Sequence, residues 1–427
     1  MATERGLAVA VVGGGWAGLA AAVQSTRRGH RVHLFEMAPR LGGRARSVDH
    51  GALVLDNGQH ILIGAYTETL ALMRAVGVSP DDALLRTPLR LRDAQGRGLT
   101  LPSGSALPSF VRGVLAQGDW RLADRLRLLA VAAGWALRGF DCPPATTVQT
   151  LARHLPTAVV RELVDPLCVA ALNTPAAEAS GQVFLRVLRD ALFAGPGSAD
   201  LLLPRRGLGE LLPAAAERWL RGQGAQIACT HRVERIEPDA GGWRVDGERF
   251  DHVVLAASAS EAARLTQPHA PDWAARAAAL RYEPIVTVYL RSTSTVLPEP
   301  MLTLTSDAMH RPAQFVFDLG RLGAEPGLLA FVISGARDWV ERGADATRAA
   351  TEAQAAEALG PLLRQPLQPV RLVTEKRATF RCTPGLDRPG ADIAPGLRAA
   401  SDYVAGPYPA TLEGAVRAGL AAVPGRH

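Results

Sequence analysis

The residues best suited to do chemistry begin with a glycine cluster near the N-terminus. Gly13, Gly15 and Gly18 occupy the three glycine positions of the pattern G-x-G-x-x-G. Gly13 permits a tight turn, Gly15 lets a pyrophosphate approach the backbone, and Gly18 lets a helix pack close to a strand. The apolar run at residues 7–12 predicts a buried parallel strand, and residues 19–29 predict a helix after the turn. Because a helix N-terminus binds phosphates, the pattern predicts a dinucleotide site.

A carboxylate completes this pattern. Residues 30–36 predict a second strand, and Glu36 ends it 21 positions after Gly15. At this place a carboxylate can accept hydrogen bonds from both hydroxyls of an adenosine ribose. Enzymes that use NAD and enzymes that use FAD share the fingerprint, so the motif alone leaves the choice between them open.

A second polar cluster, Asp56-Asn57-Gly58-Gln59-His60, precedes an apolar run that predicts a buried strand. A simple turn needs fewer hydrogen-bonding side chains, so Gln59 and His60 are candidates for contact with a ligand. No G-x-S-x-G elbow is present, no carboxylate pair stands out, and the four cysteines lie far apart without C-x-x-C spacing. The sequence thus indicates neither a hydrolase nor a metal site, and a bound cofactor must supply the chemistry.

The next segment resembles the second signature of the flavin-containing amine oxidase superfamily. Residues 37–47 read MAPRLGGRARS and contain Arg40, Gly42, Gly43 and Arg44. The glycines allow close backbone approach, and Arg44 offers a planar fork for a phosphate or for the flavin side of the dinucleotide. The resemblance therefore implies FAD as the cofactor.

Two distant segments extend this resemblance. At residues 396–422 it implies that Asp402 binds the ribityl chain and that the following helix points its N-terminus at the flavin phosphate. The superfamily usually has Gly-Asp here, whereas this chain has Ser401-Asp402. The resemblance further implies that the backbone of Val233 contacts adenine and that Gly58 passes close to the flavin ring.

A narrower resemblance, over nearly the whole chain, is to the hydroxysqualene dehydroxylases of bacterial hopanoid biosynthesis. It is carried by DNGQHILIGAYTETLALMRAVG from residue 56, PLCVAALNTPAAEAS from residue 166 and YPATLEGAV from residue 408. It implies that reduced FAD delivers hydride to hydroxysqualene, a C30 isoprenoid, and that the hydroxyl leaves as water to give squalene. An allylic alcohol can ionise to a delocalised cation once its oxygen is protonated, and a dry apolar tunnel would protect that cation.

Two roles remain open for the GQH segment. Either His60, the preferred proton donor, or Gln59 hydrogen-bonds the leaving hydroxyl, or both residues only bind the flavin or backbone groups. Asn173 and Tyr408 are secondary candidates. Asn173 precedes Thr-Pro and is more typical of a turn, and Tyr408 is better suited to line a pocket than to act as an acid.

The order of these motifs predicts an α/β fold with a Rossmann-type FAD-binding domain and a discontinuous α+β substrate domain, as in amine oxidases. Residues 1–80, 200–265 and 375–427 are assigned to the FAD-binding domain. Residues 81–199, largely helical by pattern, and residues 266–374, with alternating strands, are assigned to the substrate-binding domain.

The charge and hydropathy of the sequence limit the kinds of partner that the protein can have. The net charge is +6, but the arginines are scattered without interleaved aromatic residues, so a nucleic-acid partner is not expected. No apolar window is long enough to span a bilayer. The predicted helix at residues 119–140 has arginines around an apolar middle, so it either covers the core or lies on a membrane surface. The expected location is the cytoplasm, with peripheral contact at the inner face of the membrane as an option.

Other functions stay open at this point. A carotenoid-type desaturase would run the electrons from an isoprenoid into oxidised FAD, and a non-catalytic flavoprotein would act as a scaffold for a terpenoid complex. An amine oxidase is disfavoured because no aromatic pair stands out to hold an amine. The sequence points to no particular electron donor and to no oligomeric state.

Overall fold

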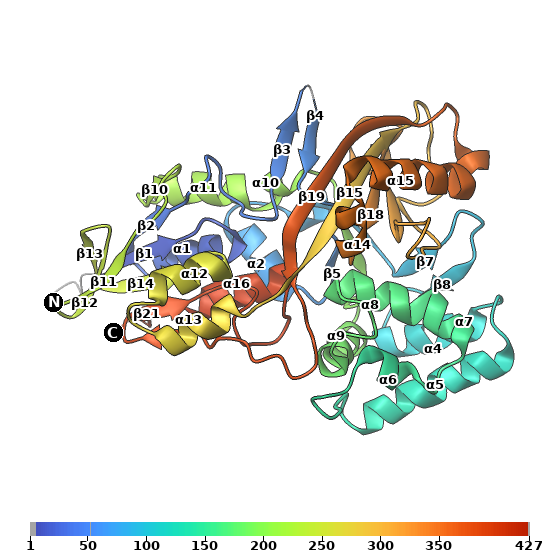
Figure 1. Cartoon of the computed structure of the whole chain (residues 1–427), viewed down its shortest axis with the longest axis horizontal. Coiled ribbons are helices and arrows are strands. Elements are labelled where there is room, and N and C mark those ends of the chain that lie inside the picture. The colour runs from blue at the N-terminus through green and yellow to red at the C-terminus, as the bar shows by residue number, and fades with distance from the viewer. Residues whose placement is uncertain (1–5, 52, 426–427) are drawn as a thin grey trace.

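The N-terminal glycine motif lies in a six-stranded sheet with the order β10-β2-β1-β14-β21-β20 (Figure 1). The computed structural model describes residues 6–51 and 53–425, and every element named here belongs to those ranges. The strands are β1 (Ala8–Val12), β2 (Arg31–Phe35), β10 (Gln226–Ala228), β14 (His252–Leu255), β20 (Asp392–Ala394) and β21 (Leu397–Ala399). Neighbouring strands are parallel except for β20, which runs antiparallel to β21 at the edge. The predicted Rossmann-type α/β sheet is confirmed.

Helices and a small meander bury both faces of this sheet, which explains why β14 is buried at every residue. One face packs against α1 (Trp16–Arg27), α11 (Pro213–Gly222) and α16 (Leu412–Ala421). The other face packs against α12 (Ala259–Thr266), α13 (Pro271–Ala278) and the meander β11 (Ile236–Asp239), β12 (Gly242–Val245) and β13 (Glu248–Phe250). The apolar strands therefore sit in the middle of a three-layer unit.

A second, antiparallel sheet has the order β16-β17-β18-β15-β19. Its strands are β15 (Tyr282–Arg291), β16 (Met301–Thr303), β17 (Phe315–Asp318), β18 (Leu328–Ile333) and β19 (Gln368–Phe380). One face packs against α14 (Arg337–Arg342) and α15 (Ala344–Leu359), and the other adds Tyr289, Phe315, Phe317 and Val332 to the largest core cluster. This sheet carries the period-two alternation that the sequence predicted for the second insertion.

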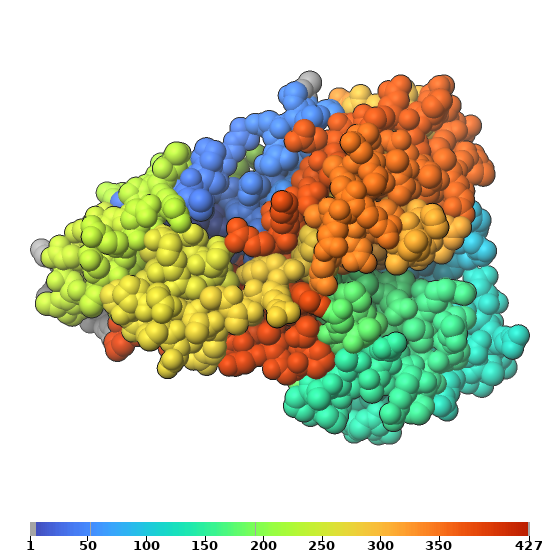
Figure 2. All heavy atoms as spheres, in the orientation of Figure 1, coloured from blue at the N-terminus to red at the C-terminus, as the bar shows by residue number. Residues whose placement is uncertain are grey.

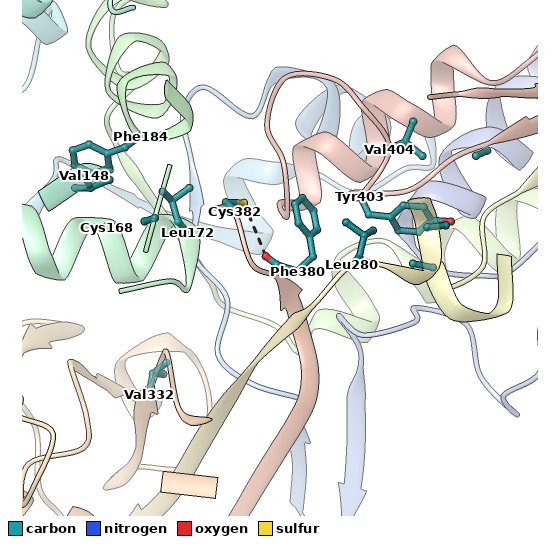
Figure 3. Packing of buried hydrophobic residues seen from close by; sticks show 14 of the residues in the cluster. Val148, Cys168, Leu172, Phe184, Leu280, Val332, Phe380, Cys382, Tyr403 and Val404 are labelled. Carbon is teal, nitrogen blue, oxygen red and sulfur yellow. Dashed lines mark hydrogen bonds between the residues drawn. The ribbon is translucent and has the colours of Figure 1, made fainter. Parts of the chain in front are cut away.

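The first insertion is largely helical, as predicted, and its helices form a separate lobe in the space-filling view (Figure 2). Its helices are α4 (Ala106–Ala116), α5 (Leu122–Leu137), α6 (Val148–Ala152), α7 (Thr157–Val159), α8 (Asp165–Leu172) and α9 (Gly181–Phe193). Cys168, Leu172 and Phe184 of this lobe share one buried cluster with Phe380 and Tyr403 (Figure 3). The hydrophobic core thus runs without a break from the helical lobe to the parallel sheet.

Short elements connect these units. They are β3 (Ser47–His50), β4 (Leu53–Asp56), β5 (Leu62–Ile63), β6 (Leu84–Thr87), β7 (Arg90–Arg92), β8 (Gly98–Thr100), β9 (Leu201–Pro204), α2 (Thr67–Ala75), α3 (Pro80–Ala83) and α10 (Leu208–Leu211). The strand expected after His60 is only the two residues of β5, which pair with β9. The domain boundaries assigned from the sequence stay a prediction, and β19 runs across one of them at residue 375.

In the described part of the chain, no helix has both the length and the apolar content to cross a membrane.

Candidate active site

The glycine loop between β1 and α1 has the geometry that the sequence predicted. Gly13 has φ +110°, and a Cβ atom there would lie 2.6 Å from the carbonyl oxygen of Ala256. A Cβ atom on Gly18 would lie 1.8 Å from the carbonyl oxygen of Gly13. Gly13 must be glycine because of the tight turn, and Gly18 must be glycine because the helix packs close to the strand. Neither requirement depends on a ligand.

Gly15 is different, because the protein leaves room around it. Its φ of −73° suits any residue, and the nearest atom to an added Cβ is the Cα of Gly43 at 3.8 Å. Gly15 is the N-cap of α1, where no side chain caps the helix and the first turn has no acidic residue. The N–H groups of that turn are therefore available to a ligand in the space between Gly15 and Gly43, which we call the cradle. This space fits an anionic pyrophosphate.

Glu36 and Val233 lie together beside this loop. The Glu36 carboxylate is buried and accepts hydrogen bonds from the N–H groups of Gly14 and Ala38, each at 2.7 Å. The N–H of His231 donates to the carbonyl oxygen of Glu36 at 2.9 Å, which brings the chain at Val233 alongside. Within the described ranges the Val233 N–H donates to no protein acceptor. An adenosine could therefore find a carboxylate for its ribose and a free donor for its base here.

Arg44 and Asp402, 358 positions apart in the sequence, form an ion pair. The Nη2 atom of Arg44 lies 2.5 Å from Oδ1 of buried Asp402, and its Nη1 atom donates to the carbonyl oxygen of Ala378 on β19 at 2.7 Å. The Ser401 hydroxyl donates to the same Oδ1 atom at 2.9 Å. The serine that replaces the superfamily's glycine thus supports the carboxylate.

Asn57 joins this pair to the GQH segment. Its Nδ2 atom donates to the carbonyl oxygen of Arg44 and to Oε2 of Glu375, each at 3.0 Å. Since Glu375 lies on β19 and Asp402 follows β21, these contacts connect the two large sheets. We call Arg44, Asn57, Glu375 and Asp402 the inter-sheet node.

The other residues of the second signature divide into two groups. Gly42 and Gly43 have φ +119° and +60° and lie against the glycine loop, where the N–H of Gly42 donates to the carbonyl oxygen of Gly14 at 2.8 Å. Arg40 instead makes a surface ion pair with Asp49 at 2.6 Å, and 64% of its side chain is exposed. The structure therefore does not bring Arg40 to the other predicted cofactor residues.

His60 is held by its own loop, next to the node. Its Nδ1 atom lies 2.9 Å from the carbonyl oxygen of Gly58, which has φ +96°. A carbonyl can only accept, so Nδ1 carries a proton and Nε2 is left to bind another group. Burial lowers the pKa of His60, and the nearby charge of Arg44 lowers it further, so the ring is neutral at pH 7. The half-buried Gln59 side chain has no hydrogen-bond partner among the described residues.

Comparison with known proteins places this site in a family. Residues 16–423 match the family described as flavin containing amine oxidoreductase. This chain belongs to the flavin-containing amine oxidoreductase family. The hydroxysqualene dehydroxylases of Sinorhizobium fredii and Rhodopseudomonas palustris are each 29% identical to it, with 96% of both chains covered in each case. An oxidoreductase from Methanosarcina mazei has the same fold, with a TM-score of 0.71, 17% identity, and coverage of 97% of this chain and 99% of that one.

The family match makes this flavin-containing amine oxidoreductase an FAD-dependent enzyme, and the resemblance to hydroxysqualene dehydroxylases is confirmed. The residues fit the cofactor. The cradle at Gly15 suits the pyrophosphate, and the carboxylate of Glu36 suits the adenosine ribose. The inter-sheet node lies beside Gly58, the glycine expected next to the flavin ring. When bound, FAD supplies hydride or accepts it.

The two secondary candidates make contacts within the protein. Asn173 is buried with φ +47°, and its Nδ2 atom donates to the carbonyl oxygen of Glu283 at 3.1 Å. Its Oδ1 atom accepts from the N–H of Gly335 at 2.7 Å, so it ties the end of α8 to the antiparallel sheet. Tyr408, with φ +59°, packs its ring under the guanidinium of Arg417 at 4.9 Å.

Sequence reasoning missed Glu413, a fully buried carboxylate on α16. It accepts hydrogen bonds from the N–H groups of Glu68 and Thr69 at 3.1 and 2.9 Å, and it pairs with Arg417 at 2.8 Å. It therefore caps the N-terminus of α2 from another helix. A glutamate in the first turn of a predicted helix is common, so no local signal distinguished this one.

Exchanging Gly15 for alanine should weaken FAD binding without changing the stability of the fold. The Gly15→Ala variant should keep the unfolding free energy of the apoprotein, because the protein leaves room for the methyl group. It should weaken FAD binding by at least about tenfold, or ~1.4 kcal/mol, because the methyl group occupies the pyrophosphate cradle. Urea unfolding of apoprotein and fluorescence titration with FAD measure the two effects.

Gly18→Ala is the matched control. Its Cβ atom would meet the Gly13 carbonyl oxygen, so the apoprotein itself should be destabilised. Normal FAD affinity in Gly15→Ala would show that no ligand uses the cradle.

The lowered pKa of His60 should make folding depend on pH in a defined direction. The unfolded chain binds a proton near pH 6.5, whereas the folded chain binds it only at lower pH, so stability falls as pH drops below that value. Relative to His60→Gln, the holoenzyme should lose up to about 1.4 kcal/mol of unfolding free energy for each pH unit in this window.

Urea unfolding of both proteins between pH 8 and pH 5 measures this difference. The comparison with the variant is needed because burial raises the pKa of Asp56 to about 6, which acts in the opposite direction in both proteins. Parallel stability profiles would contradict the assignment of His60 as a neutral imidazole.

Proposed function

We propose that this enzyme removes the hydroxyl group of hydroxysqualene reductively and releases squalene. The observation that carries the proposal is the similarity to two hydroxysqualene dehydroxylases over 96% of each chain, with the GQH segment placed next to the inter-sheet node. A match confined to the FAD-binding motifs would favour no substrate. Here the similarity extends through both insertions.

The proposed reaction replaces the hydroxyl group of the substrate with hydrogen. The allylic carbon–oxygen bond would break, the hydroxyl group would take up a proton and leave as water, and the reduced cofactor would supply the hydride for the new carbon–hydrogen bond. The protein must supply a proton at the oxygen, exclude bulk water and hold the chain in line. An electron donor must reduce the cofactor between turnovers.

His60 is suited to manage the proton. Its Nδ1 atom is committed to the Gly58 carbonyl oxygen, so a proton gained from solvent enters at Nε2. Because burial disfavours the imidazolium, this form is a stronger acid than an exposed histidine and can pass its proton to a departing hydroxyl. Gln59, half-buried and without a hydrogen-bond partner among the described residues, is suited to orient that oxygen.

Anaerobic turnover tests the proposed reaction. The holoenzyme is reduced, hydroxysqualene in detergent is added, the flavin absorbance is followed and the products are identified by mass spectrometry. We expect the oxidised flavin spectrum to return with one squalene formed per flavin. A flavin that stays reduced would reject the reaction and direct attention to desaturation by the oxidised enzyme.

His60→Phe should slow this reoxidation by about 10²–10⁴-fold while retaining bound flavin, since that is the usual contribution of a general acid. His60→Asn, which keeps polarity without an acid, is the companion variant. Turnover of His60→Phe at the wild-type rate would remove the acid role.

We further propose that α5 lies on an anionic membrane surface, from which an apolar substrate would enter. Leu128 and Trp135 face the core, but the opposite side of the helix is also apolar. That outward stripe, spaced at helical intervals and exposed throughout, consists of Leu122, Leu126, Ala130, Ala133 and Leu137. Exposed arginines flank it at positions 121, 127 and 138, and α5 follows the outer edge of the helical lobe (Figure 1). These features suit the interface of a bilayer.

Vesicle flotation checks this contact. With phosphatidylglycerol-containing liposomes, exchange of Leu122, Leu126 and Leu137 for glutamate should abolish flotation, because buried apolar area is lost and the charge opposes the lipid. Val296→Glu with Met309→Glu is the matched control, since both side chains are about as exposed but lie in the other insertion. Equal flotation of the α5 variant and the wild type would disprove the contact.

A further inference from the structure

Thr287 on β15 has a buried hydroxyl group with no hydrogen-bond partner in the described part of the chain. The residue is 0% exposed, and its Oγ1 atom makes no hydrogen bond within residues 6–51 and 53–425. A buried polar group left in this state destabilises the protein, so such groups are rare and call for an explanation. A bound ligand that completes the hydrogen bond is one such explanation.

The hydroxyl group faces the GQH segment. Thr287 shares a face of β15 with Tyr289, whose hydroxyl donates to the carbonyl oxygen of Asp56 at 2.9 Å. Thr287 lies two residues before Tyr289 in the strand. Its Oγ1 atom lies 3.6 Å from the position that a Cβ atom on Gly58 would occupy. Apart from the neighbours of Gly58 in the chain, no other described atom lies within 4 Å of that point. The unpartnered hydroxyl therefore lies against Gly58, in the loop that carries His60.

The neighbours of Thr287 within the sheet are apolar. Its cross-strand neighbours are Val332 on β18 and Val373 on β19, and Phe315 follows on β17. Val332 and Phe315 belong to the large apolar core cluster. A neutral hydroxyl among such residues suits one neutral oxygen on an otherwise apolar molecule.

We propose that the Thr287 hydroxyl group hydrogen-bonds the hydroxyl oxygen of the isoprenoid substrate and sets that oxygen beside His60. The inference rests on the proposed function and adds a residue that selects for the oxygen. Thr287 donates one hydrogen bond to the substrate, while His60 handles the proton. The carbon–oxygen bond is thereby held at the loop rather than elsewhere along a uniform hydrocarbon chain.

The test measures binding of two lipids to the oxidised holoenzyme, hydroxysqualene and squalene, by calorimetric titration in detergent. Thr287→Val removes the hydroxyl and preserves the volume, and Thr287→Ser preserves the hydroxyl. In Thr287→Val the dissociation constant of hydroxysqualene should rise about tenfold and that of squalene should stay unchanged. Thr287→Ser should regain most of the preference for hydroxysqualene.

Thr351→Val is the matched control. Thr351 is equally buried, but its hydroxyl donates to the carbonyl oxygen of Thr347 at 2.8 Å. Its loss should lower the stability of the protein and leave the preference between the lipids unchanged. Thr287→Val should not lower stability in the same way, because it removes no hydrogen bond of the protein.

Three results would overturn the role of Thr287. These are an unchanged preference for hydroxysqualene in Thr287→Val, equal weakening of both lipids, or a loss confined to FAD affinity and the flavin spectrum, which would place the hydroxyl against the cofactor. Failure of the proposed function is a separate result. In that case the wild type itself would not prefer hydroxysqualene and would not turn it over.

Discussion

The ion pair between Arg44 and Asp402 is the contact on which the geometry of the site depends. A buried carboxylate needs compensation, and here one guanidinium supplies it while also donating to the backbone of β19. The pair thus links the loop after β2, the end of β21 and the longest strand of the antiparallel sheet. Asn57 adds the GQH segment to the same node through the Arg44 carbonyl and Glu375. Four side chains thus connect the two sheets with the GQH segment.

This arrangement separates two tasks. The parallel sheet and its glycine loop offer backbone donors and bare backbone, which suit the charged and polar end of FAD. The antiparallel sheet offers an apolar face, interrupted by Thr287 and by the hydroxyl of Tyr289, which suits a hydrocarbon with one oxygen. His60 stands where the two surfaces meet. The proposed reaction, with hydride from one side and an apolar substrate on the other, would fit this arrangement.

The parts that the sequence predicted well depend on local backbone chemistry. Gly13, Gly18 and Glu36 act within one strand-turn-helix-strand unit, so their spacing carries their geometry. Asn57, Glu413 and Asn173 form hydrogen bonds with residues far away in the chain. No local sequence pattern predicts these hydrogen bonds. The two-sided character of α5 was visible as a mixed pattern, but only packing showed which leucines face outward. In the sequence, Thr287 is an ordinary strand residue. Only the folded structure shows that its hydroxyl group has no hydrogen-bond partner among the described residues.

The most direct test of the role of the node is a double-mutant cycle with Arg44→Gln, Asp402→Asn and the combination, read as the dissociation constant of FAD. If the pair acts as one unit, each single variant should weaken binding and the double variant should be little worse than either. The coupling free energy should then be about 0.5–3 kcal/mol. Effects that simply add, or single variants with wild-type affinity, would contradict the claim that this pair organises the flavin site.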